Sequence, residues 1–254
     1  MMHKKNMSSF FGLSWRLAAV DFKLRNEGSY LGTLWYFLNP LLLFLTLNFV
    51  FAQRLGADIP DYPVYLLIGI LLFNFFTRTT LDATQAVRES GFIKSFTFKR
   101  EALVLSVVLK HLMAHIFESG LFFVVLLLLG LPLYSILIYF LILFFVAIFV
   151  FGCSLLLAAL TMFFTDLANV WSFFTTLVWF ATPIFYSIEG QETLLWVNQA
   201  NPMYYFITAS RDGILTGVVP ELQIVIGVVL FPLITLSLGL YVFNALKPKF
   251  AEMI

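Results

Sequence analysis

His111, His115 and Glu118 are the residues whose types and spacing come closest to a chemical site. They follow one another at intervals of four and three, so they share one helix face, and imidazole and carboxylate groups are common zinc ligands. The first five residues of this stretch read HLMAH and lack the glutamate that serves as general base in H-E-x-x-H zinc proteases. We therefore expect no metal here and interpret His115 and Glu118 as buried polar residues in a structural or gating hydrogen bond.

Motifs of other catalytic classes are missing from the sequence. It contains no G-x-x-x-x-G-K-[ST] phosphate loop, no G-x-S-x-G nucleophile elbow and no paired acidic motif of a membrane prenyltransferase. Its single cysteine, Cys153, stands in an apolar stretch, so an intrachain disulfide or a cysteine metal cluster is excluded. We therefore expect no catalytic residues and no cofactor bound by this chain.

The composition indicates that the chain is folded in a membrane. Of its 254 residues, 61% are hydrophobic and 11% are charged, and the mean hydropathy is +0.95. A soluble domain carries about 25% charged residues, so this chain has too little polar surface to cover its core in water. The balance of 15 Lys and Arg against 14 Asp and Glu gives no sign of a nucleic-acid partner.

Apolar stretches of about 20 residues, the length that crosses a bilayer, predict an all-α protein with six transmembrane helices. Four spans stand alone, at residues 33–53, 63–81, 167–188 and 222–246. The other two share the uncharged stretch 119–165, which the sequence Gly-Leu-Pro at 130–132 breaks into a hairpin. The last two spans each contain a proline, Pro183 and Pro232, which neighbouring helices can accommodate.

The basic residues predict the orientation of these spans. Of the 15 Lys and Arg residues, all except Arg54 and Arg211 fall before the first span, around the second connection or after the last span. Cytoplasmic segments carry such an excess, so both termini are expected in the cytoplasm. The whole chain, 1–254, is interpreted as one domain: an interface segment 1–32, a transmembrane region 33–246 and a cytoplasmic tail 247–254.

Two cytoplasmic segments are expected to have functions of their own. Residues 8–25 form an amphipathic pattern with Arg16 and Lys23 on a polar face, which is typical of a helix lying in the membrane surface. A generic basic anchor is the alternative. Residues 88–101 combine basic side chains with four large apolar ones, which favours docking onto another protein over a simple solvated loop.

The segment 189–221 is expected on the outer side, before the last span. Asn201 and Pro202 are typical of the cap and first turn of a short helix, and residues 193–200 form a second helical stretch. The pair predicts a re-entrant or interfacial hairpin.

Taken in order along nearly the whole chain, these features resemble the type-2 ABC permeases that export polysaccharides and polyol phosphates. The resemblance rests on Asp21, Lys23 and Arg25 with Leu31-Gly32, Leu34-Trp35 and Asn39-Pro40, on the stretch from Phe92 to Glu101, on Asp166-Leu167, on Trp179 with Pro183-Ile184 and Tyr186, and on Asn201-Pro202 with Arg211 and Pro220. Two residues depart from the family pattern: Lys99 stands where proline is frequent, and Thr165 where a basic residue often precedes the aspartate.

The resemblance implies a homodimer of this chain in the bacterial inner membrane, joined to a separate ABC nucleotide-binding subunit that holds ATP and Mg²⁺. The implied cargo is a lipid-linked polysaccharide such as O-antigen, capsule or teichoic acid. Coupling to the ATPase is then expected at Phe92, Ile93, Lys94, Phe98, Arg100, Glu101 and Asp166. The interface helix would use Arg16, Asp21, Lys23 and Arg25. The outer gate or path would use Tyr186, Trp196, Asn201, Pro202, Tyr204, Tyr205 and Arg211.

Other interpretations stay open at this point. The chain is also compatible with a small-molecule or drug exporter of the same superfamily, or with a membrane-embedded transferase. A transferase requires paired acidic residues on a cytoplasmic loop, where the sequence offers Asp166 and its neighbours. The outer aromatic residues could equally form an interfacial belt rather than line a path.

The orientation is tested by cysteine labelling. A cysteine in place of Gln191 should react with a membrane-impermeant maleimide on intact cells, because 189–221 is expected outside. A cysteine in place of Ser90 should react only after the membrane is permeabilised. The reverse labelling pattern would overturn the predicted orientation.

Overall fold

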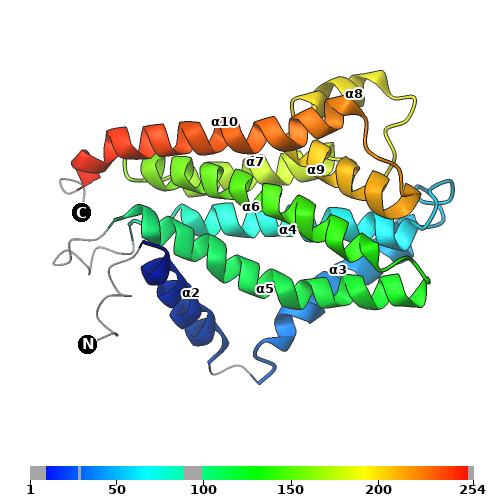
Figure 1. The fold of residues 1–254 in the computed structure, drawn as a ribbon, viewed down its shortest axis with the longest axis horizontal. Helices are drawn as coiled ribbons and strands as arrows, with labels where there is room; N and C mark the ends of the chain where they lie inside the picture. Colours follow the sequence, from blue (N-terminus) through cyan, green and yellow to red (C-terminus); the bar gives the residue numbers. More distant parts are fainter. Residues whose placement is uncertain (1–9, 28–29, 89–98, 251–254) are drawn as a thin grey trace.

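Long helices lie side by side and give the protein the shape of an elongated bundle (Figure 1). The computed structural model describes residues 10–27, 30–88 and 99–250. Its helices are α2 (Phe10–Asn26), α3 (Leu34–Phe51), α4 (Tyr62–Ala83), α5 (Glu101–Leu128), α6 (Tyr134–Thr161), α7 (Leu167–Ala181), α8 (Glu192–Gln199), α9 (Pro202–Arg211), the π-helical turn η2 (Asp212–Thr216), α10 (Leu222–Leu246) and the 3₁₀ turn η3 (Lys247–Lys249). The described residues contain no β-strand.

Five of these helices, α3, α4, α5, α6 and α10, are long and apolar enough to cross a membrane, as expected of an integral membrane protein. The predicted break between the third and fourth spans is confirmed: α5 ends at Leu128 and α6 begins at Tyr134. Gly130 lies between them with φ of 68°, a left-handed conformation that glycine adopts without a steric penalty.

The apolar helix α7 is shorter than the predicted span 167–188. Its 15 residues end at Ala181, and Thr182 is extended, with ψ of 134°. The ring of Pro183 disfavours the helical conformation of the residue before it, so the helix ends there. The expectation that Pro183 lies inside a helix is therefore wrong, whereas Pro232 does lie inside α10. The six-span arrangement stays a prediction.

Helix α4 forms the centre of the bundle. Its membrane-spanning window is 72% buried, against 11% for α3 and 28% for α10. The continuous run from Leu66 to Phe73 is buried on every side, as expected for a helix that is apolar all round. Helices α3, α5, α6, α7 and α9 all pack against it.

Helices α6 and α10 approach one another until their backbones touch at two glycines. A Cβ atom on Gly152 would lie 2.5 Å from the backbone nitrogen of Leu236, and one on Gly239 would collide with the carbonyl oxygen of Gly152. Small residues at a helix crossing allow such close packing in membranes, where dispersion contacts rather than water exclusion hold helices together.

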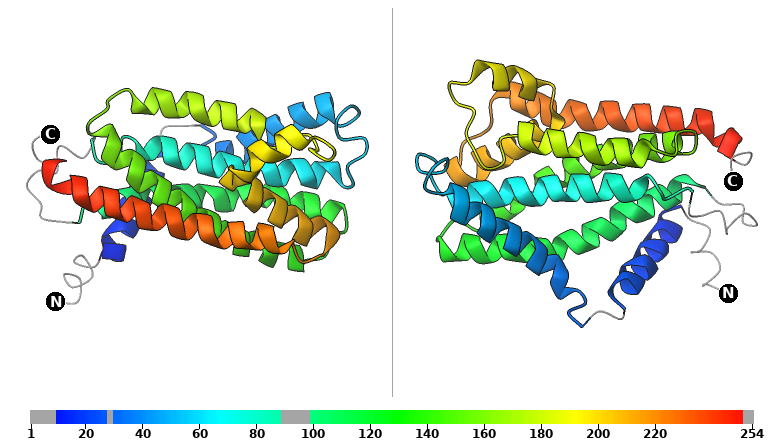
Figure 2. Two further views of the ribbon diagram at one scale, coloured as in Figure 1. Left: turned by 90° about the horizontal axis from the view of Figure 1, so that it is seen from above. Right: turned by 180° about the vertical axis from the view of Figure 1, so that it is seen from behind.

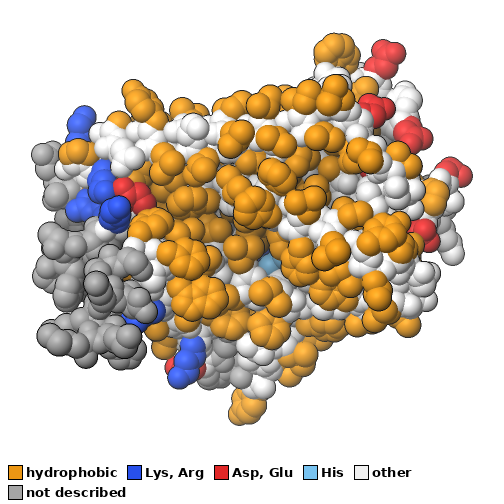
Figure 3. Space-filling view, viewed as in Figure 1, with side chains coloured by type: hydrophobic (Ala, Val, Ile, Leu, Met, Phe, Trp, Pro, Cys, Tyr) orange, Lys and Arg blue, Asp and Glu red, His pale blue; other side chains and the backbone are white. Residues whose placement is uncertain are grey.

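Charged side chains gather at the two ends of the bundle, with an apolar surface between the ends (Figure 3). We call one end the basic end; it carries Arg25, Arg88, Lys99, Arg100, Lys247 and Lys249. We call the other the acidic end; it carries Asp58, Asp61, Glu189, Glu192, Asp212 and Glu221. The first described helix, α2, and the last turn, η3, lie at the basic end (Figures 1 and 2).

Substitution Gly239→Ala tests the close crossing of α6 and α10. The new methyl group meets backbone rather than a flexible side chain, so the helices must separate, at a cost of about 1–3 kcal/mol in the free energy of unfolding. Thermal unfolding in detergent measures the change.

Gly120→Ala in α5 is the matched control, because no atom lies within 4 Å of its added Cβ. It should leave stability unchanged or raise it slightly. Equal shifts in the two variants would contradict the close crossing.

Candidate functional site

A chain of polar groups joins α4, α5 and α6 inside the apolar part of the bundle. Nη1 of Arg78 lies 2.7 Å from Oε1 of Glu118, and Oε2 of Glu118 lies 3.3 Å from Nδ1 of His115. Nε2 of His115 lies 2.7 Å from the hydroxyl of Tyr139. His115 and Glu118 are buried, where removing one partner would leave an uncompensated charge. This chain therefore fixes the three helices relative to one another.

His111 belongs to a different group from His115 and Glu118. Its Nε2 lies 2.8 Å from Oδ2 of Asp82, at the basic end of α4. The three residues that share one face of α5 thus divide between two sets of contacts. Within the described ranges, no cluster of His, Cys, Asp and Glu is arranged to hold a metal ion.

Asp82 is the junction of three helices at the basic end. Its Oδ2 atom lies 3.0 Å from Nζ of Lys110 and 3.4 Å from Nη1 of Arg25, in addition to His111. Arg25 belongs to α2, so Asp82 links the amphipathic helix to α4 and α5. Sequence reasoning missed this role. The sequence did contain a signal for this role: Asp82 is a carboxylate at the end of an apolar span, and such a carboxylate needs cationic partners.

Helix α2 packs closely on α5 through a narrow face made of small residues. Ser14 and Ala18, four residues apart, are buried, which allows the backbones to approach. Phe22 stacks on Tyr36 of α3 and on Phe117 of α5, with ring centroids 5.5 and 6.0 Å apart.

The polar residues of α2 have different surroundings. Arg16 and Asp21 are exposed, and Lys23 lies 3.7 Å from Glu27, with both side chains exposed. Asp21 also lines a cavity of about 490 Å³ that Asp82 and Lys110 share.

The expected coupling segment is only partly described. Phe92, Ile93, Lys94 and Phe98 lie outside the described residues. Arg100 and Glu101 begin α5 and contact the end of α10: Glu101 pairs with Lys247 at 2.7 Å, and Arg100 donates to the Lys247 carbonyl at 3.4 Å. Asp166 precedes α7 and is exposed. The described residues of the expected coupling set therefore lie at the basic end.

At the acidic end, the predicted start of a helix at Asn201 and Pro202 is confirmed. Oδ1 of Asn201 accepts a hydrogen bond from the Met203 amide at 3.1 Å, and Pro202 is the first residue of α9. Nδ2 of Asn201 donates to Oγ1 of Thr182 at 2.8 Å, which ties α9 to the end of α7.

The aromatic residues expected near the outer mouth divide by exposure. Trp196 is 72% exposed, and Tyr204 is half-buried. The hydroxyl of Tyr186 donates to the carbonyls of Phe180 and Ala181 at 2.8 and 3.0 Å. Tyr205 is 6% exposed and packs on Gly227 of α10. Tyr205 is thus a packing residue, because Gly227 leaves room for its ring; its part in an outer gate stays a prediction.

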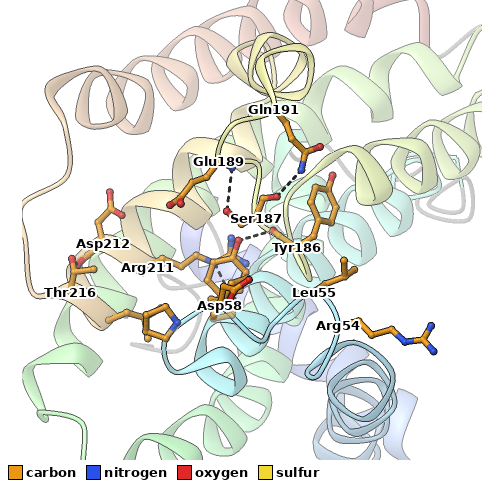
Figure 4. A pocket seen from close by; sticks show the side chains of 14 residues that line it. Arg54, Leu55, Asp58, Tyr186, Ser187, Glu189, Gln191, Arg211, Asp212 and Thr216 are labelled. Carbon is orange, nitrogen blue, oxygen red and sulfur yellow. Dashed lines mark hydrogen bonds between the residues drawn. The ribbon is translucent and has the colours of Figure 1, made fainter.

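Arg211 is a buried cation held by main-chain carbonyl groups (Figure 4). It donates to the carbonyls of Tyr65 (3.0 and 3.2 Å), Pro183 (2.6 Å) and Ile184 (2.9 Å), and its guanidinium carbon lies 3.3 Å above the ring of Tyr65. Burial lowers its pKa to about 10, so it stays charged at neutral pH. Arg211 therefore joins α9, α4 and the segment after α7.

One face of the bundle carries α3 and α7 on either side of α4 (Figure 2, right). Between them lies a cavity of about 290 Å³, lined by Leu43, Leu47, Phe51, Asn74, Trp179, Phe180 and Phe185. We call the surface of α3, α4 and α7 around it the α3–α7 groove. Helix α7 also exposes Asn169, Ser172, Phe173 and Thr176. A row of polar groups on a membrane helix is costly against lipid and favours contact with protein or water.

Comparison with known proteins assigns the chain to a family. Residues 13–215 match the family described as ABC-2 type transporter. The chain belongs to the ABC-2 type transporter family.

Similar proteins extend this match to nearly the whole chain. It is 28% identical, over 264 aligned positions, to an O-antigen export system permease protein RfbA of Klebsiella pneumoniae, covering 99% of this chain and 98% of that one. It is 24% identical to the protein of the same description from Myxococcus xanthus, covering 98% of each. ABC-2 proteins are transporter permeases, so the chain is a transporter permease as well.

Substitution Arg211→Gln tests the carbonyl cage. The shorter amide cannot reach the acceptors that the guanidinium satisfies, so buried carbonyls lose their donors and stability falls by about 3 kcal/mol or more. Denaturant unfolding of the purified protein measures the loss.

Arg54→Gln is the control, because Arg54 lies at the same end of the bundle and is exposed. It should change stability by less than about 0.5 kcal/mol. A similar small change in both variants would contradict the role assigned to Arg211.

Proposed function

We propose that this protein is the membrane subunit of an ATP-driven ABC exporter that moves lipid-linked, O-antigen-like polysaccharide across the bacterial inner membrane. The observation that carries the proposal is the α3–α7 groove, whose cavity is lined mainly by aromatic and aliphatic side chains, together with the polar residues Asn169, Ser172 and Thr176 that α7 exposes. Its membership of the ABC-2 family and its similarity to O-antigen export permeases support the same conclusion.

The channel lies between two copies of this chain. A growing glycan is too wide and too polar to pass through one closely packed bundle, whose central helix α4 is surrounded by neighbours. Helix α3 buries little of its surface within the chain, and α7 exposes Asn169, Ser172 and Thr176 beside it. Pairing two such faces in a homodimer removes them from lipid and encloses a path.

The lining of this path suits sugar. Aromatic rings stack against the apolar faces of sugar rings, and short hydroxyl and amide groups exchange hydrogen bonds without holding a charge. Near the outer mouth, Tyr186, Trp196 and Tyr204 extend the aromatic lining. The hairpin of α8 and α9 closes this outer mouth. Its position is held by Tyr205, Asn201, Pro202 and Arg211.

ATP hydrolysis takes place in a separate nucleotide-binding subunit, which holds ATP and Mg²⁺. This subunit docks at the basic end, which we place in the cytoplasm with both chain termini. The residues proposed to contact it are Phe92, Ile93, Lys94, Phe98, Arg100, Glu101 and Asp166. Asp82 and Arg25 lie at the same end, so a movement of α2 reaches α4 and α5 directly.

Cysteine cross-linking tests the channel and the dimer together. In a Cys153→Ser background, Thr176→Cys should form a disulfide between two copies in the membrane, because the proposed two-fold axis runs beside α7 and residues close to such an axis meet their own copies. Surface display of the glycan should stop on oxidation and recover when the disulfide is reduced. Immunoblotting and staining of the cell-surface glycan measure the two effects.

Leu238→Cys is the control, since Leu238 is exposed on α10, away from the groove. It should neither cross-link nor change export. Export that continues through a fully cross-linked Thr176→Cys dimer would refute the path. Efflux of hydrophobic dyes without any glycan display would favour a drug exporter instead.

A further inference from the structure

A cavity of about 630 Å³ opens at the acidic end within a single copy of the chain (Figure 4). Three segments form its wall: the loop 54–60 between α3 and α4, residues 186–191 after α7, and 211–216 from the end of α9 through η2. Its volume lies in the range of small-molecule sites, about 300–1,000 Å³. It shares no lining residue with the cavity of the α3–α7 groove.

Three carboxylates surround this cavity. Asp58, Glu189 and Asp212 come from the three different wall segments (Figure 4). Asp58 and Glu189 are exposed to solvent and Asp212 is half-buried, and among the ion pairs of the described residues none involves these carboxylates. Burial, with Glu221 adding to the effect, raises the pKa of Asp212. Its carboxylate is thus partly shielded from water.

Arg211 has one N–H group that is not used in its contacts with main-chain carbonyls. A guanidinium has five N–H groups, and Arg211 uses four in its bonds to main-chain carbonyls. One hydrogen on Nη1 is left without an acceptor among the described residues, although the side chain is only 6% exposed. Arg211 also lines the cavity. A ligand oxygen would complete its set of hydrogen bonds.

The remaining lining combines polar side chains (Arg54, Ser187, Gln191 and Thr216) with apolar and aromatic ones. Leu55, Ile59 and Leu215 contribute aliphatic surface, and Tyr65 contributes a ring already covered on one face by Arg211. The ligand must therefore offer several hydroxyl donors, an oxygen acceptor and an apolar face. The three carboxylates outnumber the two lining arginines, Arg54 and Arg211, so the cavity favours an uncharged ligand over a phosphate, and an acyl chain would leave the carboxylates unpaired.

We propose that this cavity is a saccharide-binding site that receives one unit of an uncharged glycan at the outer side of each copy. Asp58, Glu189 and Asp212 accept hydrogen bonds from sugar hydroxyls, and Arg211 donates to a sugar oxygen. Leu55 and Ile59 cover the apolar face of the ring. This assignment rests on the proposed function, because the glycan that leaves the path is the ligand that would reach the cavity.

Saturation-transfer NMR on the full-length permease in lipid nanodiscs tests the site directly. The probes are methyl α-mannopyranoside, methyl β-galactopyranoside and N-acetylglucosamine. At least one should receive saturation from the wild-type protein. The double variant Glu189→Gln, Asp212→Asn should bind it at least about tenfold more weakly, because two charge-assisted hydrogen bonds become neutral ones.

Glu192→Gln is the matched control, because Glu192 is exposed on the neighbouring helix α8 and does not line the cavity. It should bind the sugar as the wild type does. Wild-type protein that binds none of the three sugars overturns the proposal. Unchanged sugar binding by the double variant, or an equal loss of binding in the control, also overturns it. Thermal unfolding confirms that all variants are folded.

The experiment separates this site from the export function. Sugar binding is measured on the permease alone, without an ATPase subunit and without transport. If the protein binds sugar but exports no glycan, the proposed export function is refuted and the proposed saccharide site stands. Normal glycan export by a permease that binds no sugar refutes the site alone.

Discussion

The buried Arg211 is the interaction on which the acidic end of the molecule depends. Pro183 ends α7 and leaves a non-helical segment within the protein, whose carbonyl groups have no helical N–H partners. Inside an apolar environment such groups must be satisfied by the protein itself. Arg211 satisfies those of Pro183 and Ile184 and also binds the Tyr65 carbonyl on α4. Gly69 keeps the space open, since a Cβ there would lie 3.1 Å from Nη2 of Arg211.

The central helix α4 is held by polar contacts at both ends. At the acidic end the Tyr65 carbonyl meets Arg211, and towards the basic end Arg78 and Asp82 meet partners on α5 and α2. These contacts contribute more to stability in an apolar bundle than on a solvent-exposed surface, because the loss of one partner leaves a polar group that nothing else can solvate. Helices α4, α5 and α6 therefore form a fixed centre, while α3 and α7 present their outer faces.

This division suits the proposed exporter. A fixed centre keeps the two ends of the bundle in register, and the exposed helices at its surface are available for the proposed interface between copies. The hairpin of α8 and α9 connects to the centre through Arg211 and to α7 through Asn201 and Thr182. A displacement of α7 at the channel thus acts on the outer cavity through two short polar contacts. At the basic end, Asp82 gives α2 a comparable connection.

The sequence by itself determined the membrane class, the hairpin at Gly130, the helix that starts at Asn201 and Pro202, and the separation of charge between the ends. Each of these follows from local composition or from backbone preferences within a few residues. Tertiary structure alone decided that Pro183 ends a helix while Pro232 lies inside one, and that Tyr205 is buried. It also decided which partners His111, His115 and Arg211 take. Arg211 and the Tyr65 carbonyl are 146 residues apart, and only the packing of α9 on α4 brings a cation to acceptors that no local pattern connects.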